Sequence, residues 1–343
     1  MYPHIRCSGF FWIVSFIFYF SLLCNYSNAK QPDSCLWIVT NRIKAPEKEN
    51  DALFGSTLDP EGRLRYTKAC HCPGGRWIYQ IRPDFTALLS DMPGNRDIVI
   101  NVHGDHKTFD EAAERGWQIS DEYNVSVLLF TWPSELPDAT GARNFKNSKS
   151  NVRTSAPGFY RFLKLVEKSK EQKSSPLHNN HITLFHHSLG NYFLQRLVED
   201  PDIELDLDRH LIDNLVLNAA AVNAKNHIAW LEKLNFQKRL FVISNKKDFN
   251  LNGVRIFTSD GRQLGERLDL PLAGTAVYIN FSEAVGFKIP TGLSHTYFIG
   301  EVPEEVPNIR KFYRSLFHGE GIDVSDPTMF RINIEGLGYD LLK

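Results

Sequence analysis

The segment HITLFHHSLGNYFLQ, residues 181–195, constrains the fold of this chain more than any other stretch. A short apolar run ends abruptly at Ser188, and a helix-forming stretch follows at once. A serine on a tight turn between a buried strand and a helix has the geometry of a nucleophile elbow. Such a turn strains the serine backbone and holds its Oγ clear of the sheet, while the helix N-terminus directs N–H groups at whatever the serine attacks.

The usual pattern at such a turn is G-x-S-x-G, and this chain has His186 where the first small residue belongs. Small residues allow the backbone to turn sharply and to pack closely. We therefore expect His186 to point outward, or the turn to differ. Taken alone, the stretch also fits a plain strand end followed by an ordinary helix cap, because Ser and Asn are good N-cap residues.

An upstream strand end supplies the second part of the predicted site. The apolar run DIVINV, residues 97–102, ends in His103-Gly104-Asp105-His106. A strand that runs into His-Gly is where a fold with a nucleophile elbow places its second oxyanion-hole donor, a backbone N–H just after the glycine. We predict that the backbone amides of Asp105 and Leu189 form the oxyanion hole.

Two downstream strand ends supply a carboxylate and an imidazole in the order that a Ser-Asp-His enzyme of this fold requires. Asp248 follows the run RLFVIS, residues 239–244, and is predicted to orient the histidine. His295 lies beyond the run AVYINF, residues 276–281, and is predicted to be the general base. Taken alone, Asp248 fits a turn-forming residue better than a catalytic acid. The rival acids and bases are Asp206, Asp208, Asp213, His227 and His318.

With these motifs in place, the chain resembles the bacterial α/β-hydrolase family long catalogued as a domain of unknown function. The resemblance spans roughly residues 35 to 317. The matching stretches are VTNR (39–42), FGS (54–56), VHGDHKTFDEAAERGWQIS (102–120), LLFTWPS (128–134), HHSLGN (186–191), SNKKD (244–248) and SHTYF (294–298). The resemblance implies an α/β-hydrolase fold with Ser188 as nucleophile, Asp248 as acid and His295 as base. Family members usually carry Ala or Gly at the position of His186, and the family has no firmly assigned substrate.

Apolar runs alternate with helical patterns along the chain, which predicts a mostly parallel sheet of about eight strands with helices on both faces. The first two strands, joined without a helix, are expected to form an antiparallel start, and the site is expected at the carboxyl ends of the strands. Strands are predicted at 37–41, 76–82, 97–102, 125–131, 181–185, 212–218, 239–244 and 276–281, and helices at 108–123, 157–173, 191–199, 226–234 and 307–317.

Two long connections, residues 133–155 and 249–274, are predicted to be loops that shape access to the site. Neither is long enough for a helical cap domain, so we expect a fairly open pocket. Trp132, Tyr192 and Tyr297 are candidates to line the pocket and bind substrate, and core packing is the alternative for all three.

The N-terminus is predicted to lie outside the fold. A positively charged start, a dense apolar run at 10–23 and the small-residue sequence Ser27-Asn28-Ala29 together indicate a signal peptide over residues 1–29. An uncleaved anchor is the alternative, because the uncharged stretch 7–29 is just long enough to cross a bilayer. Residues 30–343 are then expected to form a single domain, secreted or periplasmic, with 318–343 as a C-terminal extension.

Cysteine usage is consistent with export to an oxidising compartment. Cys35 precedes the first predicted strand, so a disulfide with Cys70 or Cys72 would connect the N-terminal strands. Cys70-His71-Cys72 lacks a second ligand pair at zinc-finger spacing, and no metal site is predicted.

A formal net charge of −1 gives no indication of nucleic acid or an anionic membrane as a partner. The predicted function is an exported serine hydrolase that needs no cofactor and acts on a small-molecule or lipid-like carboxylic ester, in preference to an amide or peptide. A non-catalytic binding module on a decayed hydrolase fold and an acyltransferase with the same triad are the alternatives. The sequence does not indicate an oligomeric state.

Overall fold

The computed structural model describes residues 35–45, 53–72, 75–288 and 290–343. The predicted signal peptide, residues 1–29, lies outside these ranges. Among the described residues, no helix is both long and apolar enough to cross a lipid bilayer.

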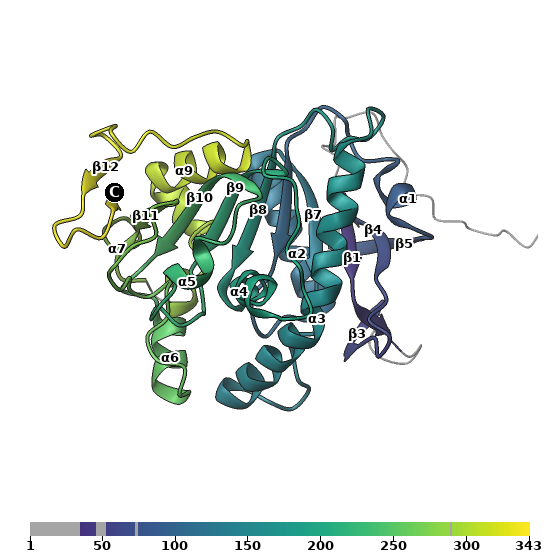
Figure 1. Ribbon diagram of the computed structural model, residues 1–343, viewed down its shortest axis with the longest axis horizontal. Helices are drawn as coiled ribbons and strands as arrows, with labels where there is room; N and C mark the ends of the chain where they lie inside the picture. The colour runs from purple at the N-terminus through teal and green to yellow at the C-terminus, as the bar shows by residue number, and fades with distance from the viewer. Residues whose placement is uncertain (1–34, 46–52, 73–74, 289) are drawn as a thin grey trace, which may run out of the picture. The chain divides into compact units, whose positions relative to one another are not determined.

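Eleven strands of the described chain form one sheet in the order β12-β13-β11-β10-β9-β8-β6-β7-β1-β4-β5 (Figure 1). Every neighbouring pair from β13 to β1 is parallel, and the remaining pairs at the two edges are antiparallel. The predicted α/β fold with a mostly parallel sheet is therefore confirmed. The strands are β1 (Cys35–Thr40), β4 (Arg65–Cys72), β5 (Arg76–Arg82), β6 (Ile98–Val102), β7 (Ser126–Thr131), β8 (Ile182–His187), β9 (Ile212–Asn218), β10 (Gln237–Ser244), β11 (Ala276–Asn280), β12 (Phe330–Ile332) and β13 (Tyr339–Leu341), with β2 (Arg42–Lys44) and β3 (Phe54–Leu58) in a separate pair.

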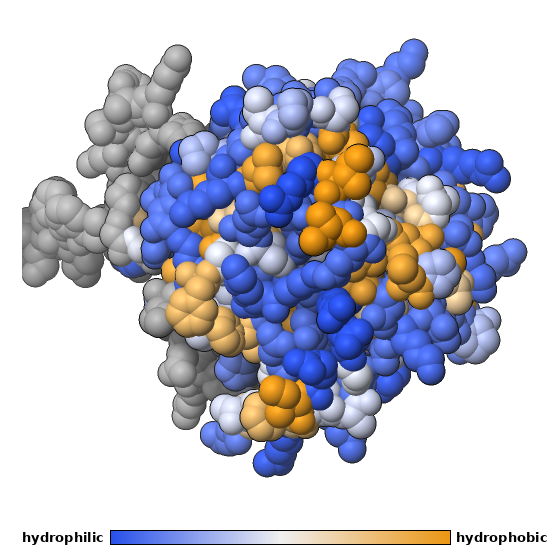
Figure 2. Space-filling model, turned by 90° about the vertical axis from the view of Figure 1, so that its left-hand side faces the viewer, coloured by the Kyte–Doolittle hydropathy of each residue, from blue (hydrophilic) through white to orange (hydrophobic). Residues whose placement is uncertain are grey.

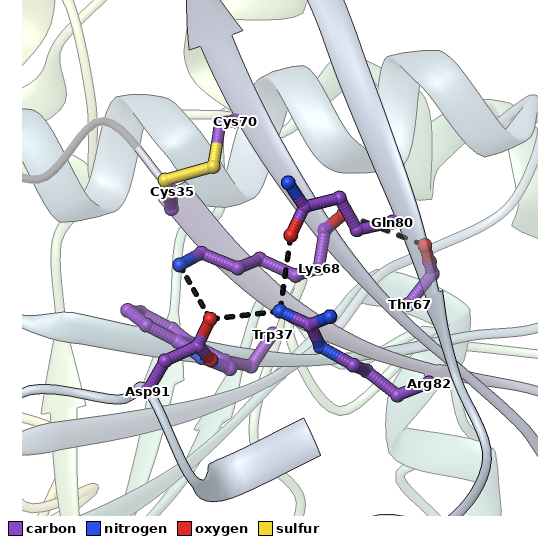
Figure 3. Close-up of a disulfide and its surroundings, with 8 residues drawn as sticks. All are labelled: Cys35, Trp37, Thr67, Lys68, Cys70, Gln80, Arg82 and Asp91. Atoms are coloured by element: carbon purple, nitrogen blue, oxygen red, sulfur yellow. Dashed lines mark hydrogen bonds and ion pairs between the residues drawn. A yellow bond between two sulfur atoms is a disulfide. The ribbon is translucent and has the colours of Figure 1, made fainter. Parts of the chain in front are cut away.

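The first edge of the sheet corrects one prediction. The strand at 76–82 does not pair with the first strand, because β4 lies between β1 and β5. Cys35 and Cys70 are register partners on the antiparallel strands β1 and β4, and a disulfide joins them. Beside that disulfide, the Nζ atom of Lys68 lies 2.7 Å from a carboxylate oxygen of Asp91, and Arg82 lies 2.8 Å from the same oxygen (Figure 3). Covalent and ionic links therefore both hold this edge together.

The other edge is formed by the predicted C-terminal extension, residues 318–343. β13 pairs in parallel with β11, and β12 pairs with β13, so the extension continues the sheet (Figure 1). Figure 2 views this side of the molecule and shows apolar side chains in separate groups within a largely hydrophilic surface.

Helices cover both faces of the sheet (Figure 1). Consecutive strand residues point to opposite faces, and Phe185 of β8 contacts Phe317 while His186 contacts Phe159. The helix that contains Phe317 therefore packs on one face and the helix that contains Phe159 on the other. The helices are α1 (Phe85–Leu89), α2 (Phe109–Tyr123), α3 (Gly141–Lys170), α4 (Tyr192–Glu199), α5 (Ile228–Leu231), α6 (Phe249–Phe257), α7 (Ser282–Val285), α8 (Glu301–Glu305) and α9 (Pro307–Phe317), with 3-10 turns η1 (Ser188–Asn191) and η2 (Thr291–Ser294).

The two connections predicted to be long loops are partly helical. Helix α3 begins at Gly141 rather than near Pro157, and α6 follows directly after Asp248. In α3 the buried face includes Asn144 and Ser148, whose side chains both donate hydrogen bonds to the carbonyl oxygen of Ser134. Because these buried residues are polar, the first half of α3 lacks the regular apolar spacing from which a helix is predicted.

Candidate active site

The turn after β8 places Ser188 in a strained backbone conformation. Ser188 has a φ of 52°, in the left-handed region that residues other than glycine seldom adopt, and it begins the 3-10 turn η1. A Cβ at Gly190 would lie 2.6 Å from the carbonyl oxygen of Val102, so only glycine allows the turn to pack so closely on β6.

Gly104 lies directly against the serine. A Cβ on Gly104 would lie 2.6 Å from the Cβ of Ser188 and 3.3 Å from its Oγ. The chain that leaves β6 therefore passes beside the hydroxyl, and Asp105 lines the same cavity as Ser188. Leu189, the other predicted oxyanion donor, is the second residue of η1, where a backbone N–H has no acceptor within its own helix.

Asp248 and His295 are brought together from the ends of different strands. The Nδ1 atom of His295 lies 2.6 Å from Oδ2 of Asp248, which is completely buried. The other carboxylate oxygen accepts hydrogen bonds from the backbone amides of Asn250 and Leu251 at 3.0 and 3.1 Å. Because an ionised carboxylate only accepts hydrogen bonds, Nδ1 of His295 carries the proton and Nε2 is left as the basic nitrogen.

The segments that carry these two residues are also joined to each other. Asn245 donates a side-chain hydrogen bond to the carbonyl oxygen of Ser294 at 2.8 Å, and the backbone amide of Phe249 donates to the Ser294 hydroxyl at 3.3 Å. The position of His295 is therefore fixed by its neighbours as well as by Asp248.

The rival titratable residues lie elsewhere. His227 contacts the Tyr278 hydroxyl at 2.9 Å, and His318 contacts Asp97, the residue just before β6, at 2.7 Å. Asp97 marks the amino ends of the parallel strands, the edge opposite to Ser188. Asp213 pairs with Lys238 at 2.8 Å. None of the rival acids and bases lines the cavity that contains Ser188.

A cavity of about 1270 Å³ contains both Ser188 and His295 in its wall. Asp248 is covered by its neighbours and does not line it. The apolar part of the wall comes mainly from α6 and from the segment around His295. Its members include Phe145, Leu251, Val254, Leu293, Phe298 and Ile299.

The three aromatic residues predicted to bind substrate do not line this cavity. Trp132 is fully buried, and its ring stacks on that of His103 at a centroid distance of 5.4 Å. Tyr297 is also fully buried, and Tyr192 is 7% exposed and accepts a hydrogen bond from Arg153. All three side chains are therefore part of the core, which was the alternative expectation for them.

His186 also departs from its predicted position, because it points into the protein. It is completely buried, and its ring meets Phe159 of α3 edge-on at 5.5 Å. Nδ1 lies 2.8 Å from the carbonyl oxygen of Gly190, while the buried Nε2 has no hydrogen-bond partner among the described residues. Burial lowers the pKa of His186 to about 3. The imidazole is thus a neutral core group behind the turn.

His187, the next residue, lines the same cavity as Ser188, a role that its position in the sequence does not indicate. Its ring centroid lies 4.6 Å from that of His295, and its Nδ1 lies 3.2 Å from the side-chain nitrogen of Asn218. Burial lowers the pKa of His187 well below its ordinary value, and the charges of His295, Arg115 and Lys107 lower it further. His187 therefore packs against the catalytic base candidate as an uncharged ring.

Arg42, the last residue of the VTNR motif, supports the loop that follows β6. It is completely buried and donates hydrogen bonds to the carbonyl oxygens of Lys107 at 2.8 Å and Trp132 at 2.6 Å. Burial lowers the pKa of this guanidinium to about 9. Burial and the charge of Arg42 also lower the pKa of His103 to about 3, so His103 is a neutral part of the same support.

Within the described ranges, no group of three His, Cys, Asp or Glu side chains is placed to hold a metal ion. In the Cys70-His71-Cys72 trio, Cys70 is bonded to Cys35 and cannot supply a thiolate ligand.

Comparison with known proteins gives a family but no defined activity. No curated protein matches the sequence. Among solved structures, feruloyl esterase B from Aspergillus oryzae is similar over 55% of this chain, at 15% identity and a TM-score of 0.23. This chain spans only 34% of that enzyme. A family described as an alpha/beta hydrolase of unknown function (DUF900) matches residues 83–271, more than half of the sequence. The chain belongs to this alpha/beta hydrolase family.

Proposed function

We propose that this protein is a serine hydrolase that cleaves carboxylic esters through an acyl-enzyme on Ser188. One observation carries the proposal. A serine in a left-handed turn shares a cavity with His295, and the far nitrogen of that histidine is hydrogen-bonded to the buried Asp248. A nucleophile, a base and a group that orients the base are the parts that acyl transfer requires.

In the first step, Nε2 of His295 takes the hydroxyl proton of Ser188 while Oγ attacks the ester carbonyl carbon. The amides of Asp105 and Leu189 would hold the resulting oxyanion. The bond to the alkoxide oxygen then breaks, and His295 returns the proton to the leaving alcohol. In the second step His295 takes a proton from water, the hydroxide attacks the acyl carbon, and Ser188 recovers its proton as the carboxylic acid leaves.

Asp248 would hold the imidazole in the tautomer that this sequence of steps needs and would stabilise the imidazolium that forms. The two backbone amides bound to its other oxygen prevent the carboxylate from rotating away. The carboxylate is therefore preorganised for this role before substrate binds.

The position of His186 weighs against a decayed site. Its ring lies behind the turn, among the helices, and leaves Ser188 and Gly104 in close contact. The apolar lining of the cavity suits a small-molecule or lipid-like ester.

We also propose that the protein is exported. The predicted signal peptide and the disulfide between Cys35 and Cys70 support this, because disulfides persist mainly in oxidising compartments.

The test is hydrolysis of 4-nitrophenyl butyrate by the purified protein, beside Ser188→Ala and His295→Ala. We expect both variants to lose activity by about 10³-fold or more. Ser90→Ala, at the exposed serine that caps the C-terminus of α1 and does not line the cavity, is the matched control and should retain activity. A protein trapped with one butyryl group on Ser188 in mass spectrometry would identify the acyl-enzyme. Equal hydrolysis by the wild type and Ser188→Ala would reject the proposed mechanism.

A further inference from the structure

Two cationic side chains near the start of α2 line the cavity that contains Ser188. Lys107 follows the His103–His106 segment, and Arg115 lies on α2. Both are half-buried. Among the described residues, neither side chain forms an ion pair or a hydrogen bond, in contrast to Lys68 and Arg82, which both contact Asp91.

The lack of a partner for Arg115 has a local cause. Glu111, four residues earlier on α2, is at the spacing that normally gives an ion pair with an arginine. Its carboxylate instead accepts hydrogen bonds from the backbone amide and the hydroxyl of Thr108, at 2.9 and 3.3 Å, in a capping box. Glu114, the adjacent residue, lines the same cavity and, like Glu111, attracts the guanidinium without forming an ion pair with it. The guanidinium is therefore left without a bound acid.

Lys107 and Arg115 both lie close to the candidate catalytic residues. Their charges act on His187, whose ring packs against His295. Both side chains are only partly exposed, and this burial lowers the pKa of each although the charge of Glu111 raises it. A half-buried cation that has no hydrogen-bonded acid is incompletely solvated, and an anion in the cavity would supply the missing contact.

Acidic residues in the same wall limit the charge of such an anion. Asp105 lies at the same end of the cavity, where it accepts a hydrogen bond from Asn144 at 2.9 Å and where burial raises its pKa. Glu111 and Glu114 lie along α2. The remaining acids of the wall are Asp121, Glu122, Glu301 and Glu304, and Arg310 lines the wall with them. A singly charged carboxylate is repelled less by these acids than a doubly charged phosphate.

We propose that Lys107 and Arg115 bind a carboxylate on the substrate, so that the enzyme acts on esters whose acyl part carries a second, free carboxylate. This specificity site rests on the proposed esterase function and names its substrate class. Arginine supplies a planar pair of donors to the carboxylate, and lysine adds a point charge.

Binding to Ser188→Ala tests this inference without catalysis. Monomethyl glutarate and methyl pentanoate are ligands of similar length that differ by a carboxylate. Calorimetry should show that the anionic ligand binds at least about 10-fold more tightly, and that inorganic phosphate binds more weakly than this ligand. Adding Arg115→Gln to Ser188→Ala should weaken monomethyl glutarate binding by about 10- to 100-fold. Adding Arg143→Gln instead is the matched control, because Arg143 is exposed and does not line the cavity.

Absence of a preference for the anion, including no detectable binding of either ligand, would overturn the inference. So would an Arg115→Gln effect no larger than that of Arg143→Gln, and tighter binding of phosphate would overturn the assignment to a carboxylate. These outcomes are separate from the proposed function, since wild-type hydrolysis of 4-nitrophenyl butyrate would still establish an esterase.

Discussion

Burial of His186 makes a quantitative prediction about stability at acidic pH. The folded protein holds this imidazole neutral, since burial lowers its pKa from an ordinary 6.5 to about 3. When the chain unfolds, the imidazole regains its ordinary pKa and takes up a proton below pH 6.5. Above about pH 6.5 the imidazole is neutral in both states and does not oppose folding. As the pH falls from 6.5 toward 3, only the unfolded state binds the proton, so the free energy of unfolding decreases.

The size of this effect follows from the two pKa values. Between pH 7 and pH 5 the unfolded imidazole gains about 1.9 kcal/mol of protonation free energy, at about 1.36 kcal/mol per pKa unit. The folded imidazole gains almost none over the same range. The result changes by less than about 0.1 kcal/mol if the folded pKa is 4 instead of 3, because both values lie well below the range.

The variant that isolates this effect is His186→Asn. Its side-chain amide can still donate to the carbonyl oxygen of Gly190, where Nδ1 of His186 lies 2.8 Å away, but it does not titrate. Other buried histidines remain in both proteins, so their contributions cancel in the comparison.

Urea unfolding at pH 7 and pH 5, with the disulfide intact, measures the effect. We expect the wild type to lose about 1.9 kcal/mol more stability between the two pH values than His186→Asn loses. His210→Asn, at an exposed histidine, should lose as much as the wild type. An equal loss in the wild type and His186→Asn would refute the argument that His186 is a neutral core residue.

Three further predictions concern the turn, the acid and the disulfide. Gly190→Ala would place a Cβ 2.6 Å from a backbone carbonyl oxygen at the end of β6, so soluble yield and activity should fall sharply, whereas Gly94→Ala, with open space around it, should behave as wild type. Asp248→Asn should reduce kcat for 4-nitrophenyl butyrate by about 10⁴-fold, because the amide favours the wrong imidazole tautomer; a change below tenfold would remove Asp248 from the triad. Replacing both Cys35 and Cys70 with Ser should cost about 4 kcal/mol of unfolding free energy for a bridge that spans 35 residues, measured by urea unfolding, and an unchanged midpoint would contradict the bridge.

The central strands could be predicted from the sequence because each is a short apolar run bounded by turn residues. All eight predicted strands occur within a few residues of their expected bounds. β4 was missed because its sequence, RYTKACHC, is polar and only partly buried in an antiparallel edge. β12 and β13 were missed because each has only three residues. Edge strands need less apolar sequence, so their pattern is weaker.

The three candidate triad residues could be proposed from the sequence because this fold requires them in a fixed order along the chain. Ser188, Asp248 and His295 each follow a strand, and the parallel sheet brings strand ends to one edge. The turn-forming alternative for Asp248 is also true in part, because this residue caps α6 while it contacts His295. Side chains that only tertiary packing places, such as Tyr297 in the core and Arg115 in the cavity, could not be assigned from their neighbours in sequence.

The most direct test of the account is site-mapped labelling of the intact protein with a fluorophosphonate, which reacts with activated serines. We predict that the label is found on Ser188 by mass spectrometry, and that His295→Ala abolishes labelling although its Ser188 is intact. Labelling of another serine, or no labelling of a protein shown to be folded by its cooperative unfolding, would contradict the claim that Ser188 is an activated nucleophile.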